Sequence, residues 1–204
     1  MALQLFGYIM SITGLCGLIL ATFTNEWKTI GHDNDETVFL DEYEGLWMKC
    51  TISSSSFVQC IGFNTLLHQA FEIRLARVMM ITSMVFSSLG AIVAIFGLGC
   101  TRCLDKNKQS KDRAAFAGGI LSVCSGLFAL GITSWFMYGI VDDFFQEDKK
   151  ARYVIGWSLI GAFAASLLCL FGGVLLCACS LTHLRSNTNL SKRPVSKIPG
   201  KDYV

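Results

Sequence analysis

Charged residues are scarce in this chain of 204 residues, at 16% of the composition, whereas soluble domains usually carry about 25%. They are missing altogether from four long blocks, at residues 5–24, 78–101, 114–141 and 153–182. Each block has the roughly 20 mostly apolar residues that a helix needs to cross a bilayer. The missing charge therefore excludes an ordinary soluble globule and predicts four transmembrane helices.

Motifs that carry chemistry are also absent. The chain has three histidines, which the four blocks would place on both sides of a membrane, so no shared histidine site is expected. It has no HExxH, no GxSxG and no phosphate-binding loop, and no Asp, Glu, Lys or Arg lies inside a block. These absences argue against an enzyme, a bound cofactor, a metal site built on histidine and a charged transport path.

Residues 5–24 also invite interpretation as a secretory signal peptide. No basic residue precedes them, and their end lacks the small residues at which signal peptides are cleaved. We therefore expect a retained first helix.

Lysine and arginine are distributed unevenly between the segments that flank the blocks. Residues 1–4, 102–113 and 183–204 together carry a net charge of +7, whereas residues 25–77 and 142–152 carry −5. The positive-inside rule puts the basic segments in the cytoplasm and the acidic ones outside. Both termini are then cytoplasmic, and the basic side is expected to meet anionic lipid, not nucleic acid.

Segment 25–77 has the pattern of a small sheet. Thr, Val, Ile, Phe and Trp are frequent at residues 37–40, 45–52 and 57–61, which we expect to be strands. A short helix is expected over residues 66–76, leading into the second block.

Nine cysteines are present, and Cys50 and Cys60 alone fall in the outward segments, where the compartment is oxidising. A disulfide is therefore expected between them. The two lie symmetrically about a serine run at residues 53–56, and an antiparallel hairpin with that turn would also oppose Ile52 and Val58.

The cysteines at the inner ends of the second and fourth blocks suit reversible palmitoylation. They are Cys100, Cys103, Cys177 and Cys179. A four-thiolate zinc site is the alternative if those helix ends are adjacent.

Tryptophans mark the outer ends of the blocks. Trp135 and Trp157 are expected at the membrane interface, where an indole keeps its ring in lipid and its N–H in water, and Trp27 stands at the outer end of the first block. Trp47 lies within an expected strand and is placed at the boundary between sheet and membrane.

Several residues of segment 25–77 resemble, in order and spacing, the W…GLW…C…C signature of the claudin family. They are Trp27, Gly45, Leu46, Trp47, Cys50 and Cys60. Arg77 resembles the arginine that closes this segment in claudins, and the chain ends like the claudin tails that dock on PDZ scaffolds, with Asp202, Tyr203 and Val204.

The resemblance implies a membrane four-helix bundle with a small extracellular antiparallel β-sheet, anchored on the bundle by Trp27 and Trp47. It implies a structural protein of tight junctions at the plasma membrane, which assembles with itself and other claudins in one membrane and across the gap. The C-terminal valine would dock on a PDZ scaffold by adding an edge strand, after a stretch at residues 185–200 in which no regular structure is expected.

The first outward segment is acidic, which favours cations. However, the positions where cation-selective claudins commonly carry an acid are Ser53 and Ile61 here. A cation path would need other acids, and the nearest are Asp41, Glu42 and Glu44. A solvated acidic rim is the alternative.

The second outward segment, residues 142–152, is short. Phe144 and Phe145 resemble the aromatic start of the claudin loop that makes contacts across the gap, but the usual Asn/Asp-Pro pair is missing. We expect altered adhesion. A related tetraspan of the myelin-protein or channel-auxiliary type is the alternative family, although Arg77 and the Tyr203-Val204 end favour a claudin.

Overall fold

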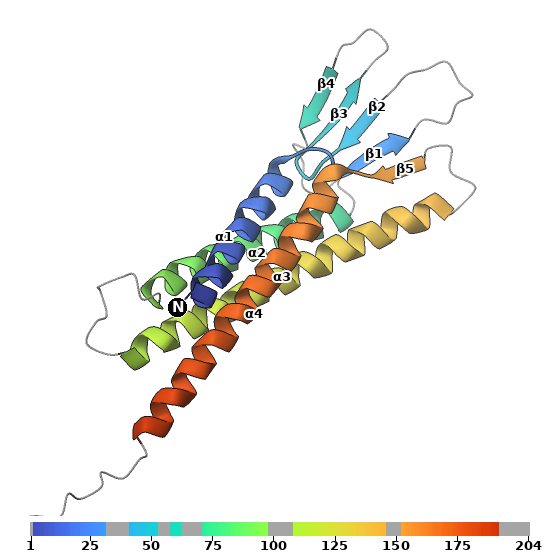
Figure 1. Cartoon of the computed structure of the whole chain (residues 1–204). Helices are drawn as coiled ribbons and strands as arrows, with labels where there is room; N and C mark the ends of the chain where they lie inside the picture. Colours follow the sequence, from blue (N-terminus) through green and yellow to red (C-terminus); the bar gives the residue numbers. More distant parts are fainter. Residues whose placement is uncertain are drawn as a thin grey trace, which may run out of the picture.

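The computed structural model describes six stretches of the chain: residues 2–31, 41–52, 58–62, 71–97, 108–145 and 152–191. Four helices form an elongated bundle, and a small sheet lies at one end of it (Figure 1). The helices are α1 (Ala2–Phe23), α2 (Phe71–Gly97), α3 (Lys108–Phe145) and α4 (Trp157–Ser191). Each is long and apolar enough to cross a membrane. The predicted fold class is confirmed.

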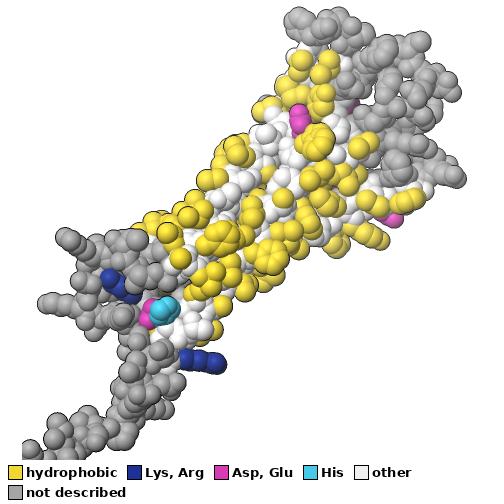
Figure 2. Space-filling model, in the orientation of Figure 1, with side chains coloured by type: hydrophobic (Ala, Val, Ile, Leu, Met, Phe, Trp, Pro, Cys, Tyr) yellow, Lys and Arg dark blue, Asp and Glu magenta, His cyan; other side chains and the backbone are white. Residues whose placement is uncertain are grey.

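Hydrophobic side chains cover the outside of the bundle, and the described charged side chains lie toward its two ends (Figure 2). Many large apolar side chains are exposed on the helices, Leu20, Val78 and Phe171 among them. Soluble monomers rarely expose an apolar surface of this extent, and on helices of this length it is typical of a surface that faces lipid.

The helices do not end where the uncharged blocks end. Residues 108–113, expected in a loop, form the first turns of α3, and α4 continues to Ser191 through part of the stretch expected to lack regular structure. Hydropathy locates the part of a helix that lies in lipid, whereas the helix itself continues into water as long as its backbone bonds form.

The predicted start of the fourth helix at residue 153 is wrong. Residues Arg152–Ile155 form strand β5, and α4 begins at Trp157. The β-branched pair Val154 and Ile155 suits a strand as well as an apolar helix, and the backbone of strand β1 supplies its pairing partner.

Small polar groups join the helices inside the bundle. The hydroxyls of Ser11 on α1 and Ser122 on α3 lie 2.5 Å apart. Ser83 on α2 and Ser125 on α3 each donate to the other's backbone carbonyl, at 3.0 and 2.8 Å. Because lipid gives no hydrophobic force between helices, bonds of this kind and close packing hold a membrane bundle together.

The sheet has five antiparallel strands in the order β4-β3-β2-β1-β5. Their bounds are β1 (Lys28–Gly31), β2 (Asp41–Glu44), β3 (Met48–Ile52), β4 (Val58–Gly62) and β5. Strands β3 and β4 lie within or close to the predicted ranges. Residues 37–40 lie outside the described parts, as do residues 66–70 of the expected short helix.

The hairpin of β3 and β4 has the predicted register. Cys50 opposes Cys60 and forms the disulfide with it, and Ile52 opposes Val58. All five residues of β4 are exposed, and within the described parts of the chain its one neighbour in the sheet is β3. The disulfide is therefore the main tertiary restraint on the outer strand.

Removing this disulfide should destabilise the sheet. For a loop of 10 residues we expect the double variant Cys50→Ser, Cys60→Ser to lose about 2 to 3 kcal/mol of folding free energy. The thermal unfolding midpoint in detergent measures the loss. Replacing the free cysteines Cys16 and Cys124 by alanine is the matched control, and an equal drop in both pairs would contradict the expectation.

Candidate functional site

The family-like residues meet where the sheet joins the bundle. We call Trp27, Gly45, Leu46, Trp47 and Arg77 the signature junction. Helix α1 ends at Phe23, which leaves the last carbonyls of the helix without partners inside it. The signature junction supplies the missing donors and fixes the sheet to that helix end.

Both indoles bond to carbonyls in the last turn of α1. Trp27 Nε1–H donates to the Ala21 carbonyl at 2.8 Å, and Trp47 Nε1–H donates to the Thr22 carbonyl at 3.0 Å. Near a bilayer an unpaired buried carbonyl costs more than in water, so these two bonds stabilise the helix end as well as the sheet.

Trp27 stands just beyond the end of α1, and its indole is buried, so it does not face lipid as an interfacial tryptophan does. Its side chain is 1% exposed and packs edge-to-face on Phe136 of α3, with ring centroids 5.4 Å apart. Trp135 and Trp157 are exposed, as an interfacial position requires. Hydropathy identifies residues near the membrane boundary but does not separate those that face lipid from those that face another helix.

Arg77 of α2 contacts the Gly45-Leu46-Trp47 turn through Leu46 and Trp47. It is 6% exposed, its Nε–H donates to the Leu46 carbonyl at 2.5 Å, and its guanidinium carbon lies 5.1 Å from the centre of the Trp47 ring. Leu46 is itself fully buried. A cation placed on an aromatic face and bonded to a carbonyl combines two attractive interactions in one buried side chain.

Two glycines let backbones meet at this junction. A Cβ on Gly45 would lie 2.5 Å from the Asn25 Cα, and a Cβ on Gly156 would lie 1.9 Å from the Glu26 carbonyl oxygen. The Gly156 N–H donates to the Trp27 carbonyl, at 3.1 Å. Gly156 was not predicted as a site residue, although a glycine between a β-branched pair and a helix start is a signal of close backbone approach.

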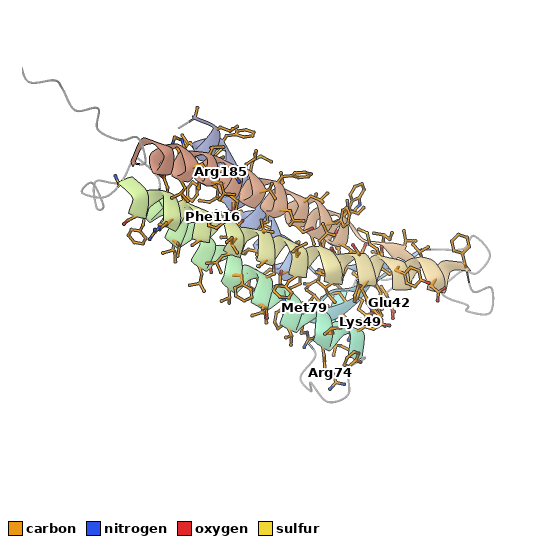
Figure 3. All side chains as sticks on the ribbon, turned by 90° about the horizontal axis from the view of Figure 1, so that it is seen from below. Glu42, Lys49, Arg74, Met79, Phe116 and Arg185 are labelled. Atoms are coloured by element: carbon orange, nitrogen blue, oxygen red, sulfur yellow. A yellow bond between two sulfur atoms is a disulfide. The ribbon has the colours of Figure 1, made fainter. Side chains whose placement is uncertain are left out.

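The charged face of the sheet is mixed in sign. Glu44 opposes both Lys28 on β1 and Lys49 on β3, and successive register pairs alternate between the two faces. Glu42 shares this face, and its carboxylate lies 2.7 Å from Lys49 Nζ. Figure 3 shows Glu42 and Lys49 side by side at the sheet end of the molecule. The acids predicted as a cation path therefore stand among lysines.

Lys28 is also held by the bundle, because its Nζ lies 4.8 Å from the centre of the Phe136 ring. Asp41, the third predicted acid, is placed by its backbone only, opposite Ile52. The sequence alone does not place Lys28 and Lys49 on the same face as the other two acids, because the face that a strand residue occupies relative to its neighbours depends on the register.

Other predicted residues lie away from this junction or outside the described parts. Phe145 ends α3 and is 76% exposed, and Phe144 precedes it in the same helix. Cys177 is half-buried on α4, where its thiol donates to the Phe116 carbonyl at 3.7 Å, and Cys179 is half-buried nearby. The predicted positions that fall outside the described residues are Cys100, Cys103, Asp202, Tyr203 and Val204.

No group of three His, Cys, Asp or Glu that could hold a metal ion occurs within the described stretches. The zinc alternative needs Cys100 and Cys103, which are not among them. The described part of the site is thus a structural junction and a mixed-charge sheet face.

Comparison with known proteins identifies a family and several similar proteins. The profile of the PMP-22/EMP/MP20/Claudin family matches residues 1–176. Claudin-1 of Mus musculus is 36% identical over 99% of this chain and 98% of its own length. Claudin-2 of Homo sapiens is 35% identical over 92% of this chain and 83% of its own length. Claudin-19 of Homo sapiens is 31% identical over 97% of this chain and 94% of its own length.

These relatives support the tight-junction hypothesis and not the myelin-protein or channel-subunit alternative. With four membrane-capable helices, the disulfide-bonded antiparallel sheet and near full-length similarity to named claudins, the chain belongs to the claudin family.

Proposed function

We propose that this claudin polymerises side by side in one membrane and face to face across the intercellular gap, as a structural component of tight junctions that sets paracellular permeability. The observation that carries the proposal is the signature junction, because it fixes the sheet to the ends of the membrane helices. Trp27 and Trp47 both bond to the last turn of α1, so a sheet held in this way can transmit contacts between molecules without detaching from its anchor.

The sheet is proposed to face outward, with both termini in the cytoplasm. The disulfide Cys50–Cys60 supports this orientation, because disulfides persist in oxidising compartments. The excess of lysine and arginine in residues 102–113 and 183–204 supports it independently. In Figure 3 Arg185 lies at the end of the bundle opposite to Lys49.

The sheet face is proposed to give a barrier of weak charge selectivity. Glu42 and Glu44 stand against Lys28 and Lys49, so the formal charges of these four side chains cancel. A path lined by this face would attract cations less than an acidic wall does. Neither a strong cation pore nor a strong anion pore is expected from it.

Neutralising one member of the pair should shift the selectivity. With Lys49→Gln we expect the permeability ratio of Na⁺ to Cl⁻ to rise about twofold, since one unit charge across a Debye length of about 8 Å is worth ~0.5 kcal/mol in water. Dilution potentials across monolayers of claudin-deficient epithelial cells measure the ratio. Glu42→Gln should shift it the opposite way. A strongly cation-selective wild type that neither variant changes would contradict the proposal.

Contacts across the gap are proposed to involve Phe144 and Phe145 at the outer end of α3. The exposure of Phe145 beyond the membrane-capable part of the helix supports this, because α3 extends past Asp142. A large aromatic ring left in water is a preferred anchor for a partner surface.

The C-terminal residues Asp202, Tyr203 and Val204 are proposed to bind a PDZ scaffold by strand addition, and the basic cytoplasmic side to bind anionic lipid. Palmitoylation is proposed at Cys100, Cys103, Cys177 and Cys179. Of the two that the structure describes, Cys177 is less available than Cys179, because its thiol donates to the Phe116 carbonyl.

A further inference from the structure

A cavity of about 450 Å³ lies between the sheet and the start of α4. Its walls include Glu26, which follows α1, Tyr43 of β2, and Trp157, the first residue of α4. Its size falls within the usual range of small-molecule sites, about 300 to 1,000 Å³. Neither the signature junction nor the charged sheet face uses these side chains.

The cavity adjoins the end of a membrane-capable helix, as a site for a lipid headgroup would. Trp157 begins a helix that can cross the membrane and is 80% exposed, which is typical of an indole at the membrane surface. Ile160, one turn deeper, also lines the cavity and is exposed, whereas the polar wall comes from the sheet. In Figure 2 hydrophobic side chains extend from the bundle onto the base of the sheet, and an acidic side chain lies among them.

The lining combines a carboxylate with two aromatic rings. No lysine or arginine from the described residues lines the cavity, so Glu26 gives it an acidic character. Carboxylates and aromatic faces together are the groups that bind quaternary ammonium ions, since the ring attracts a cation without requiring it to donate a hydrogen bond. An anionic headgroup would be repelled.

An exposed face of α4, which we call the apolar track, continues from the cavity along the helix. Exposed residues recur on one helix face at spacings of three, four and seven, and two of them are the small residues Gly161 and Ala164. A Cβ on Gly161 would meet nothing within 4 Å. The residues of this face are Trp157, Ile160, Gly161, Ala164, Phe171 and Val174.

We propose that this cavity binds the phosphocholine headgroup of an outer-leaflet lipid, with the quaternary ammonium beside Glu26, Tyr43 and Trp157 and an acyl chain along α4. Charge complementarity favours the ammonium, and the apolar track favours a lipid over a soluble choline compound. The inference rests on the outward placement of the sheet, but it does not require polymerisation.

Native mass spectrometry of the full-length protein in detergent, titrated with dioleoyl phosphatidylcholine, tests the proposal. We expect Glu26→Gln to weaken retention of this lipid about tenfold and Trp157→Ala to weaken it similarly. Glu44→Gln is the matched control, because Glu44 does not line the cavity, and it should bind as the wild type does. The backbone carbonyl of Glu26, which accepts from the Ser158 N–H, is kept in the glutamine variant.

Dioleoyl phosphatidylglycerol and phosphatidylethanolamine should be retained less than phosphatidylcholine, and soluble glycerophosphocholine should compete weakly. Equal retention of phosphatidylglycerol or phosphatidylethanolamine would overturn the ammonium assignment, and efficient competition by glycerophosphocholine would overturn the lipid assignment. Loss of self-association in Glu26→Gln with unchanged lipid binding would assign the cavity to a second copy instead. Lipid binding is measured on the isolated protein and does not depend on assembly at cell contacts. A negative result would therefore not contradict the tight-junction proposal.

Discussion

Replacing Gly156 by alanine should prevent the sheet from docking on the bundle. The new Cβ would lie 1.9 Å from the Glu26 carbonyl oxygen and 2.6 Å from its carbon, and both are backbone atoms that cannot rotate away. The chain must then separate β5 from the end of α1, which breaks the bonds from Gly156 to Trp27 and from Ser158 to Glu26. We expect a loss of about 3 to 5 kcal/mol, from overpacking together with two lost backbone bonds.

The thermal midpoint in detergent and delivery to the cell surface both measure this loss. Gly161→Ala, on the same helix, is the matched control, because a Cβ there meets open space. It should leave the midpoint within the usual range of a surface change, about 0.5 kcal/mol. Equal midpoints for the two variants would show that the close approach at Gly156 does not hold the sheet.

Replacing Arg77 by methionine should have the next largest effect. The substitution keeps most of the side-chain volume but leaves the buried Leu46 carbonyl without its donor and removes the cation from the Trp47 ring. An unsatisfied buried carbonyl costs about 1 to 3 kcal/mol and the cation–π contact about 0.5 to 2, so we expect a total near 3 kcal/mol. Arg77→Lys should recover only part of it, because an ammonium lacks the planar fork of arginine.

Arg74→Met provides the control for Arg77. Arg74 lies in the first turn of α2, about one turn before Arg77, at the same end of the molecule as the sheet (Figure 3). Its Nε has no hydrogen-bond partner among the described residues, so its loss should be nearly neutral. If Arg74→Met destabilised the protein as much as Arg77→Met does, general electrostatics of the region and not the bond to Leu46 would account for the effect.

The four helices and the disulfide hairpin were predictable because each depends on local information. Blocks without charge mark membrane helices, and the symmetry of Cys50 and Cys60 about the serine run gives the register. Strands β1 and β5 were not predictable in this way. They pair residues far apart in the sequence, Thr29 with Val154 among them, and β5 adjoins an apolar block from which hydropathy alone does not separate it.

The sequence identified the residues of the candidate site but not what surrounds their side chains. The resemblance implied that Trp27 anchors the sheet, but the sequence did not predict that its ring is buried against Phe136, because composition does not distinguish a lipid-facing position from a helix-facing one. The acidic surface was expected from the charge of segment 25–77. The register shows lysines on the same face as Glu42 and Glu44, and register depends on tertiary pairing.

Self-assembly at cell contacts is the central claim, and freeze-fracture of fibroblasts that lack tight junctions and express this chain tests it most directly. Continuous intramembrane strands are expected where two expressing cells meet, formed despite the short second outward segment. An even distribution over the cell surface, with correctly folded protein and no strands, would contradict it.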